Sequence, residues 1–149
     1  MSTRTKILVA VAALAVLVLA LSRGDDSTPE LDALEGDEMG MYVPRGGTLV
    51  DTDSQTGGTV LGMPVSASYT RLFELPEADA ARALADTEAT AKRAGWQTTQ
   101  ASGGRAFSAE KQVGPARLAL AVVLVKDARL LPEGVAPPAL SVNLRRLAA

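Results

Sequence analysis

Residues Pro76 to Trp96 read PEADAARALADTEATAKRAGW and contain the clearest helix of the chain. Proline suits the first helical position, where no backbone N–H is needed. Acidic residues occupy the first turn, and Lys92 and Arg93 occupy the last, which complements the helix dipole. Gly95 is placed as a left-handed cap, and Trp96 is the apolar residue that follows it. The helical spacing predicts a buried face of small side chains, which suits close packing on a sheet: Ala80, Leu84, Thr87, Ala91 and Ala94.

The residues before this helix have the patterns of strands. Thr48 to Val50 and Thr59 to Leu61 are short stretches on either side of a Gly57-Gly58 turn, which predicts a strand–turn–strand unit. Met63-Pro64 interrupts backbone pairing, so we expect the next strand to begin near Val65. Apolar and polar residues then alternate, which predicts a half-buried strand. Its apolar face is Val65, Ala67, Tyr69, Phe73 and Leu75, with Arg71 as the exception.

The residues after the helix predict further strands separated by glycine-containing turns. They are expected at 96–100, 106–112, 118–125 and 140–147. Residues 118–125 read LALAVVLV, and a run that is apolar on both parities is typical of a central strand covered on both sides. The helix would be one cover, and a loop or a partner chain the other. The chain is therefore predicted to be an α+β protein, with one main helix on a mostly antiparallel sheet of about four to six strands.

Ile7 to Leu21 read ILVAVAALAVLVLAL, without a charge, a proline or a glycine. We predict that residues 1–22 form a single membrane-spanning helix. A helix from Thr5 to Ser22 would be about 27 Å long, slightly short of a hydrocarbon core of about 30 Å. Lys6 and Arg23 near its ends can snorkel to the interface. The alternative is a signal peptide that is cleaved near Ser22.

The charges around this segment predict its orientation. Arg4 and Lys6 precede it, whereas no lysine or arginine occurs between Arg23 and Gly40. By the positive-inside rule, the N-terminus lies in the cytoplasm and the rest of the chain lies outside the plasma membrane. Under the alternative, cleavage near Ser22 would instead release a secreted domain.

An acidic flexible linker is predicted over residues 23–42. Gly24 to Gly40 read GDDSTPELDALEGDEMG, which is rich in acids and poor in large apolar residues. Such a composition offers little apolar surface to offset the entropy of ordering. A helical turn is expected only at Glu30 to Leu34. The predicted organisation is an anchor at 1–22, a linker at 23–42 and an extracytoplasmic α+β domain at 43–149.

Composition excludes several classes of site. The 149 residues contain no histidine and no cysteine, and their net charge is −2. Without histidine there is no Ser-His-Asp or Cys-His catalysis and no histidine-based metal site. Without cysteine the domain has no disulfide and no lipid-attachment residue, so packing alone must stabilise it. Acids and bases nearly balance in residues 48–149, so no basic face for nucleic acid is expected. We predict no catalytic residue, no cofactor and no metal.

Two local patterns are similar to parts of known sites. Ser108-Ala-Glu-Lys111 spells S-x-x-K, the nucleophile motif of penicillin-binding proteins. A strand is expected there, and residues three apart in a strand point to opposite faces. Asp51-Thr-Asp53-Ser-Gln55 opens like a calcium loop, but Thr56 and Gly62 replace the required glycine and glutamate. Both segments are therefore predicted to be polar strand or turn surface.

Two further features have a functional and a structural interpretation. Trp96 could stack on a ligand, but its position after a helix cap favours packing in the core. Arg145-Arg146 could contact anionic partners, but in an alternating strand one of the pair simply points to solvent.

This layout resembles a broad group of uncharacterised bacterial envelope domains. The resemblance covers roughly residues 43–147. It is carried by Pro44, Gly46 to Val50, Tyr69, the helix 76–94, Gly95-Trp96, Gly103-Gly104, Ala109-Glu110-Lys111 and the strand 118–125. It implies an α+β fold and an envelope location, and it carries over no active site. The chain departs from the lipoprotein members of the group because it lacks their cysteine.

The expected function is that of a non-enzymatic, membrane-anchored envelope protein. Ile7 to Leu21 would hold it in the membrane, and the domain would bind a protein or a cell-wall component. The alternative is a structural subunit of a membrane or secretion complex, in which strand 118–125 or the anchor helix packs on another chain. A hydrolase would need paired acids in a cleft, whereas the acids here fall mostly on expected turns and on a solvated helix face. No oligomeric state is predicted.

Overall fold

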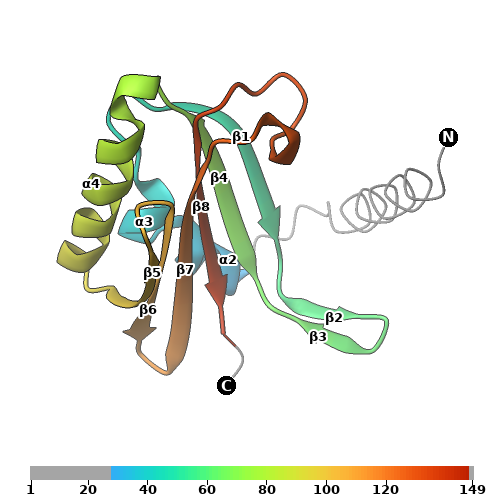
Figure 1. Cartoon of the computed structure of the whole chain (residues 1–149). Coiled ribbons are helices and arrows are strands. Elements are labelled where there is room, and N and C mark those ends of the chain that lie inside the picture. The colour runs from blue at the N-terminus through green and yellow to red at the C-terminus, as the bar shows by residue number, and fades with distance from the viewer. Residues whose placement is uncertain (1–27, 148–149) are drawn as a thin grey trace, which may run out of the picture.

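A six-stranded antiparallel sheet is the central element of residues 28–147, the part of the chain that the computed structural model describes (Figure 1). The strands lie in the order β1-β4-β8-β7-β6-β5. Their bounds are β1 Thr48–Gln55, β4 Ser68–Glu74, β5 Gln97–Ser102, β6 Ala106–Val113, β7 Ala116–Val125 and β8 Ala139–Arg146. A hairpin of β2 Gly58–Val60 and β3 Met63–Val65 projects from one end of this sheet. The predicted α+β class and the antiparallel sheet are confirmed.

Helices cover one face of the sheet. The main helix, α4 at Ala80–Arg93, follows a 3-10 turn, η1 at Glu77–Asp79. Two shorter helices, α2 at Pro29–Glu35 and α3 at Glu38–Met41, pack on the same face (Figure 1). Their buried side chains share one core with α4 and the sheet: Leu34, Met39, Leu84, Leu140, Val142 and Leu144. A further 3-10 turn, η2 at Ala128–Leu130, lies in the loop between β7 and β8.

Helix α4 follows the sequence prediction closely, apart from its start. Gly95 adopts φ +87, as expected for the left-handed cap, and Trp96 after it is buried. The predicted face is buried at Ala80, Leu84, Thr87 and Ala91, while Ala94 is half-buried. Pro76 does not begin α4. It has extended backbone angles, φ −60 and ψ 140, and caps η1, so the α-helix begins at Ala80.

The expected pairing at the start of the sheet is wrong. Thr48–Gln55 forms one long strand, β1, which pairs with β4 and not with the residues after Gly57-Gly58. Those residues form β2, which pairs with β3 across a turn at Leu61 and Gly62. The strand predicted from Val65 is consequently two strands, because Val65 ends β3 and β4 begins at Ser68. Pro64 is tolerated in β3 because that strand has β2 as its only neighbour in the hairpin sheet.

Strand β7 contains the predicted central strand and lies between β8 and β6. One parity of its side chains is buried beneath the helices: Leu118, Leu120, Val122 and Leu124. The other parity faces away from them: Ala119, Ala121, Val123 and Val125. Ala121 is exposed and Val123 is 42% exposed. The expected second cover is present only in part within residues 28–147: the loop after β7 lies over one end of this side, where Ala139 is fully buried, and leaves Ala121 and Val123 exposed.

The flexible linker predicted over 23–42 is wrong for residues 28–42. Helices α2 and α3 occupy this segment and bury Leu31, Leu34 and Met39, the last two completely. Thr28 caps α2 by accepting a hydrogen bond from Leu31 N, and Asp37 caps α3. Among the described residues the domain thus begins at Thr28 and not at residue 43. Residues 23–27 lie outside the described part of the chain.

No helix within residues 28–147 is both long enough and apolar enough to cross a membrane. The predicted anchor, Ile7 to Leu21, lies outside the described residues.

Candidate functional site

The S-x-x-K segment lies in β6, and its two polar side chains point to opposite faces. Ser108 lies across from Ala121 of β7, and its hydroxyl is 3.2 Å from Thr99 Oγ1. Lys111 lies on the helix-covered face, where its Nζ is 2.8 Å from Asp37 Oδ2. The lysine therefore cannot reach the serine hydroxyl, and the two do not form a nucleophile with its base.

The calcium-like segment is a regular strand and not a metal-binding loop. Asp51 and Asp53 are both exposed on β1. Asp51 Oδ1 accepts a hydrogen bond from Thr52 N at 2.9 Å, and Asp53 lies across from Thr70 of β4. Calcium loops fold back so that alternate residues converge on one ion, which an extended strand does not do. Within residues 28–147 there is no group of three or more acidic side chains able to hold a metal ion.

Trp96 is a core residue, as the structural interpretation expected. It is 2% exposed, and its Nε1 donates a hydrogen bond to Asp37 Oδ1 at 3.2 Å. Lys111 Nζ lies 5.7 Å from the centre of its ring. The indole therefore has no free face for a ligand. Asp37 is the residue that joins α3, β5 and β6 at this point, and it was not singled out from the sequence.

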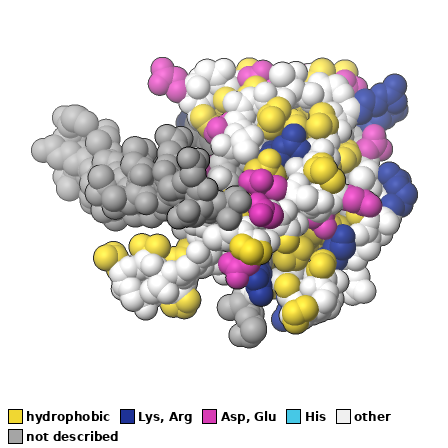
Figure 2. Space-filling view, turned by 180° about the vertical axis from the view of Figure 1, so that it is seen from behind, with side chains coloured by type: hydrophobic (Ala, Val, Ile, Leu, Met, Phe, Trp, Pro, Cys, Tyr) yellow, Lys and Arg dark blue, Asp and Glu magenta, His cyan; other side chains and the backbone are white. Residues whose placement is uncertain are grey.

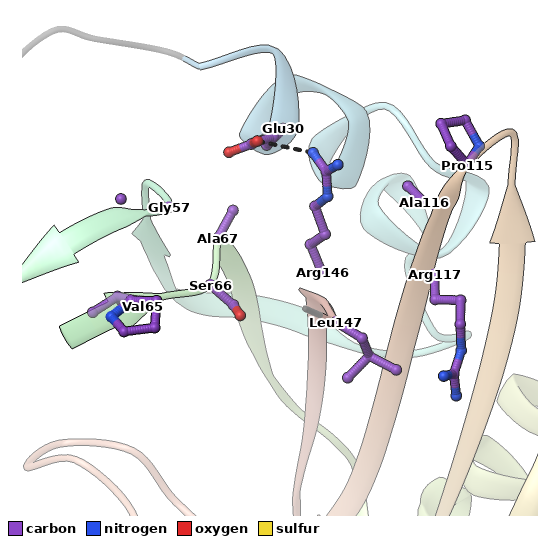
Figure 3. A pocket seen from close by; sticks show the side chains of 12 residues that line it. Glu30, Gly57, Val65, Ser66, Ala67, Pro115, Ala116, Arg117, Arg146 and Leu147 are labelled. Carbon is purple, nitrogen blue, oxygen red and sulfur yellow. Dashed lines mark hydrogen bonds and ion pairs between the residues drawn. The ribbon is translucent and has the colours of Figure 1, made fainter. Parts of the chain in front are cut away.

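Arg145 and Arg146 separate as the alternation of β8 predicts. Arg145 is exposed and lies opposite Ser68 and Ala119. Arg146 Nη1 donates to Glu30 Oε1 of α2 at 2.9 Å. This ion pair lies in a pocket of ≈ 440 Å³ at the base of the hairpin (Figure 3).

The pocket at the hairpin base is built from four segments that are distant in sequence. Figure 3 shows Glu30 of α2, Val65 and Ser66 at the end of the hairpin, Pro115 and Arg117 at the β6–β7 turn, and Arg146 and Leu147 at the end of β8. The charges are already paired, because Arg146 binds Glu30 and Arg117 binds Glu110 at 2.6 Å. The pocket thus has a mainly apolar lining, in which both arginines are already paired. It holds one carboxyl group, so it lacks the pair that a glycosidase mechanism uses.

The opposite face of the sheet is the larger candidate surface, and we call it the open face. It includes exposed and half-buried side chains that point away from the helices, from β4, β6, β7 and β8: Thr70, Ala106, Ser108, Glu110, Ala119, Ala121, Val123, Val125, Ser141, Asn143 and Arg145. In its central row Asn143 lies between Thr70 and Ala121, and Ala121 lies opposite Ser108. Asn143 Nδ2 donates to Thr70 Oγ1 at 2.6 Å. This row is uncharged and internally hydrogen-bonded.

Charges border the open face on three sides. Asp51 and Asp53 lie along the β1 edge, opposite Leu72 and Thr70. Arg145 lies at the end of the face nearest the hairpin base. The other end carries Arg105 and Lys126 in the lining of a hollow. An uncharged centre with a charged border is the general anatomy of a protein-binding patch.

Two hollows lie on this face. One, of ≈ 330 Å³, lies over the central row and is lined by Thr99, Ser108, Ala121, Asn143 and Arg145, among others. The other, of ≈ 550 Å³, lies between the end of β7 and the loop that follows, where Leu130 is 75% exposed. Each contains a single acidic residue in its lining, Glu110 or Asp127. The sequence signal for this surface was the run of alanine and valine on the second parity of strand 118–125.

The carboxyl group of Asp127, at the rim of the larger hollow, has a shifted pKa. Its pKa is lowered chiefly because the side chain of Arg129 donates hydrogen bonds to both carboxylate oxygens, and further because Arg129 N–H donates to it. A lowered pKa favours the ionised form in the folded chain. The stabilisation is therefore present above the unfolded pKa and is lost as the pH falls through the folded value. The Arg129 side chain is 88% exposed and that of Asp127 is 41% exposed, so solvent screens the interaction and the effect is local to this loop.

We expect an NMR titration of the Asp127 carboxyl carbon to show a midpoint below that of an ordinary aspartate. Replacement of Arg129 by alanine should raise this midpoint, because the donor that favours the carboxylate is then missing. The variant Arg82→Ala, on the exposed side of α4, serves as the control and should leave the midpoint unchanged. An unchanged midpoint in Arg129→Ala would contradict the assignment of the cause.

Comparison with protein-family models, curated proteins and solved structures found no match to this chain.

Proposed function

We propose that this chain is a membrane-anchored interaction module of the bacterial envelope, and that its domain binds another protein through the open face. In this proposal Ile7 to Leu21 cross the plasma membrane with the N-terminus in the cytoplasm, and the domain lies outside. The observation that carries it is the exposure of the apolar β7 strand on that face, where Val123 is 42% exposed. An antiparallel sheet commonly leaves one face in water, but the strands then alternate apolar and polar side chains, whereas β7 presents alanine and valine on its open side.

The composition of the open face favours a protein surface as the partner. The central row offers small apolar groups and neutral hydrogen-bonding groups, from Ala121, Ser108 and Asn143. An uncharged surface of this kind can approach another protein closely without leaving a charge buried and unpaired. The acidic β1 edge and the basic residues at the two ends would then orient the partner, since charges at a rim contribute more to orientation and specificity than to affinity.

A non-enzymatic role agrees with the chemistry of the described sites. The pocket at the hairpin base holds a paired glutamate and arginine, and the hollow over the central row holds Ser108 with Thr99 as its hydroxyl neighbour. Nucleophilic catalysis needs a base within hydrogen-bond reach of the nucleophile. We therefore assign these features to binding and to structure.

The second candidate is a structural subunit of a membrane or secretion complex. The same exposure of β7 favours it, because a permanent interface covers an apolar strand more completely than a transient one. The two candidate functions differ in the lifetime of the complex that the chain forms with its partner. A subunit would be recovered within one assembly of fixed mass by native mass spectrometry of solubilised membranes, whereas an interaction module would be recovered partly as a free chain.

The third possibility, a domain secreted after cleavage near Ser22, would be recognised by a mass that lacks the first residues.

Site-directed photocrosslinking in the native envelope tests the open face. With the crosslinking residue at position 123, we expect one defined protein adduct. Ala121→Arg should reduce its yield by at least about tenfold, because a long cation then occupies the uncharged centre of the interface; a factor of ten corresponds to about 1.4 kcal/mol of binding free energy. The domain should remain folded, because substitutions at exposed positions usually change stability by no more than about 0.5 kcal/mol.

The matched control is Ala85→Arg, which places the same side chain on the exposed side of α4. It should leave the adduct yield unchanged. Equal loss in both variants would contradict binding through the open face. An adduct with a wall polymer would contradict a protein partner and would identify the partner as a cell-wall component. Adducts of equal yield from crosslinkers at positions 123 and 85 would rule out a specific binding surface.

A further inference from the structure

The hairpin formed by β2 and β3 ends in an unusual turn. Its tip is Val60-Leu61-Gly62-Met63, in which Leu61 has φ 51 and Gly62 has φ 79. Two-residue hairpin turns with positive φ at both central positions strongly prefer asparagine, aspartate or glycine. Here leucine occupies the first of them, and its side chain is 93% exposed. Met63 beside it is 63% exposed. The chain thus places large apolar groups where neither the backbone nor water favours them.

The hairpin is also free of charge. No lysine, arginine, aspartate or glutamate occurs between Asp53 and Arg71. In Figure 2 the hairpin, at the lower left, carries hydrophobic and neutral surface without the blue or magenta of charged side chains, whereas the body of the domain carries both. An uncharged projecting element is suited to an apolar environment, because it brings no ionised group that must be desolvated.

The place where the chain enters the domain lies beside the base of this hairpin. The first described residue is Thr28, and α2 begins at Pro29. A Cβ atom built on Gly57 would lie 3.0 Å from Glu30 Oε2, so α2 starts against the first residues of the hairpin. The first described residues, which precede the domain's sheet, therefore lie on the side from which the hairpin projects.

The connection from the predicted anchor to the domain is short, and so is the hairpin. From Ser22, at the end of the predicted anchor, to Thr28 a fully extended chain spans at most about 20 Å. From Gly57 to Leu61 the hairpin reaches about 13 Å. A domain tethered so closely holds its hairpin tip within reach of the membrane in which the anchor sits. Tethering also gives a weakly binding tip a high effective concentration at the surface.

We infer that the β2–β3 hairpin is a lipid-contacting element, which inserts Leu61 and Met63 into the interfacial region of the bilayer that holds the anchor. This inference rests on the anchored location in the proposed function. Only the tip of the hairpin can insert into the bilayer, because β2 and β3 each have one unpaired edge whose backbone groups must remain hydrated. With its tip inserted, the hairpin would fix the orientation of the domain above the membrane and keep the open face accessible to a partner from the side.

The absence of cysteine allows the inference to be tested on the full chain with single labels. The full-length protein, carrying the fluorophore NBD on Leu61→Cys, is reconstituted into phosphatidylcholine vesicles that contain a lipid with a nitroxide near the headgroup. We expect quenching at position 61 to be several-fold stronger than at the control Ala85→Cys on the exposed side of α4. The quenching should not weaken with added salt, because no charge takes part. Equal quenching at the two positions overturns the inference.

A second variant separates membrane contact from folding. Leu61→Asn introduces a residue that the turn favours and removes the apolar side chain. With the label moved to Met63→Cys, quenching should fall in the Leu61→Asn background, while the unfolding midpoint of the domain stays the same or rises. Quenching that persists in this variant would show that the tip is not held by its apolar side chain and would overturn the inference.

Flotation of the same vesicles separates this inference from the proposed function. Protein that floats with the vesicles but is not quenched at position 61 overturns the hairpin inference alone and leaves the anchor in place. Protein that fails to float overturns both. If the tip is unquenched in lipid but a photocrosslinker at position 61 joins one protein in native membranes, the occupant of the tip is a protein groove and the lipid assignment is wrong.

Discussion

Replacement of Asp37 by alanine is expected to lower the free energy of unfolding by about 3–5 kcal/mol, because it removes one partner of a buried ion pair. The Asp37 side chain is 6% exposed and that of Lys111 is 21% exposed, with 2.8 Å between Oδ2 and Nζ. Oδ1 accepts two further hydrogen bonds, from Met39 N at 2.9 Å and from Trp96 Nε1 at 3.2 Å. Without the carboxylate, all three donors lose their acceptor at once.

Denaturant unfolding of the full chain in mild detergent measures this loss. Trp96 is the only tryptophan and is buried, so its fluorescence reports the transition, with circular dichroism as a second probe. The control Glu38→Ala removes an exposed acid from the next position and should change stability by no more than about 0.5 kcal/mol. A similar loss in both variants would contradict the role given to Asp37.

Two related variants divide the effect of Asp37 into its parts. Asp37→Asn keeps an acceptor for Met39 N and Trp96 Nε1 but removes the negative charge, so we expect a smaller loss than with alanine. The double variant Asp37→Ala, Lys111→Met should recover part of the stability lost in Asp37→Ala, because no buried cation is then left without a partner. A double variant less stable than the single one would show that Lys111 stabilises the fold by other contacts.

Local sequence signals were sufficient for most of the secondary structure. The helix that ends at Gly95, the burial of Trp96 and the central place of strand 118–125 all follow from periodicity and from cap chemistry, which depend on neighbouring residues. The order of the strands does not follow from them. The last strand, β8, lies between β4 and β7, so its partners are far from it in the sequence and no local pattern identifies them.

The segment 28–42 shows where composition misleads. It contains few large apolar residues among many acids, a mixture that is typical of disordered chains. The three that matter, Leu31, Leu34 and Met39, are buried because the surface of the sheet is there to receive them. Short helices gain their stability mainly from such tertiary packing. The ion pair between Asp37 and Lys111 joins residues 74 positions apart, which no spacing rule predicts.

The candidate surface was predictable only in part. The alanine and valine of strand 118–125 indicated a second covered face, but that this face is open within residues 28–147 is a property of the assembled sheet. The hairpin tip gave a sequence signal that was misinterpreted. A proline predicts a break in pairing before a strand, whereas Pro64 lies in β3 opposite Thr59, which leaves Leu61 and Gly62 as the turn.

Arg71 is the apolar-face exception that the alternation of β4 singled out, and its replacement by alanine is expected to lower the free energy of unfolding by about 2–4 kcal/mol, since hydrogen bonds from charged groups contribute about 1.5–3 kcal/mol each. Its Nη1 donates to the backbone carbonyls of Gly40 at 2.9 Å and Tyr42 at 2.8 Å. Its guanidinium carbon lies 4.9 Å from the centre of the Phe73 ring. The side chain thus fastens the end of α3 and the residues after it to the sheet.

The guanidinium group, and not merely a positive charge, should be required at this position. Its Nε is buried without a hydrogen-bond partner among residues 28–147, so the net gain comes from Nη1 and from stacking on Phe73. Arg71→Lys keeps the charge but loses the planar group that stacks on the ring, and we expect it to recover less than half of the loss. The control Arg82→Ala on the exposed side of α4 should be nearly neutral.

Hydrogen exchange distinguishes a local role of Arg71 from a general one. If Arg71 fastens residues 40–42, its loss should increase amide exchange in α2 and α3 more than in β6 and β7, because the short helices then open without the rest of the sheet. Uniformly faster exchange would mean that the guanidinium stabilises the whole core through Phe73. Full recovery of stability by Arg71→Lys would show that charge alone suffices, and it would contradict the role assigned to the planar group.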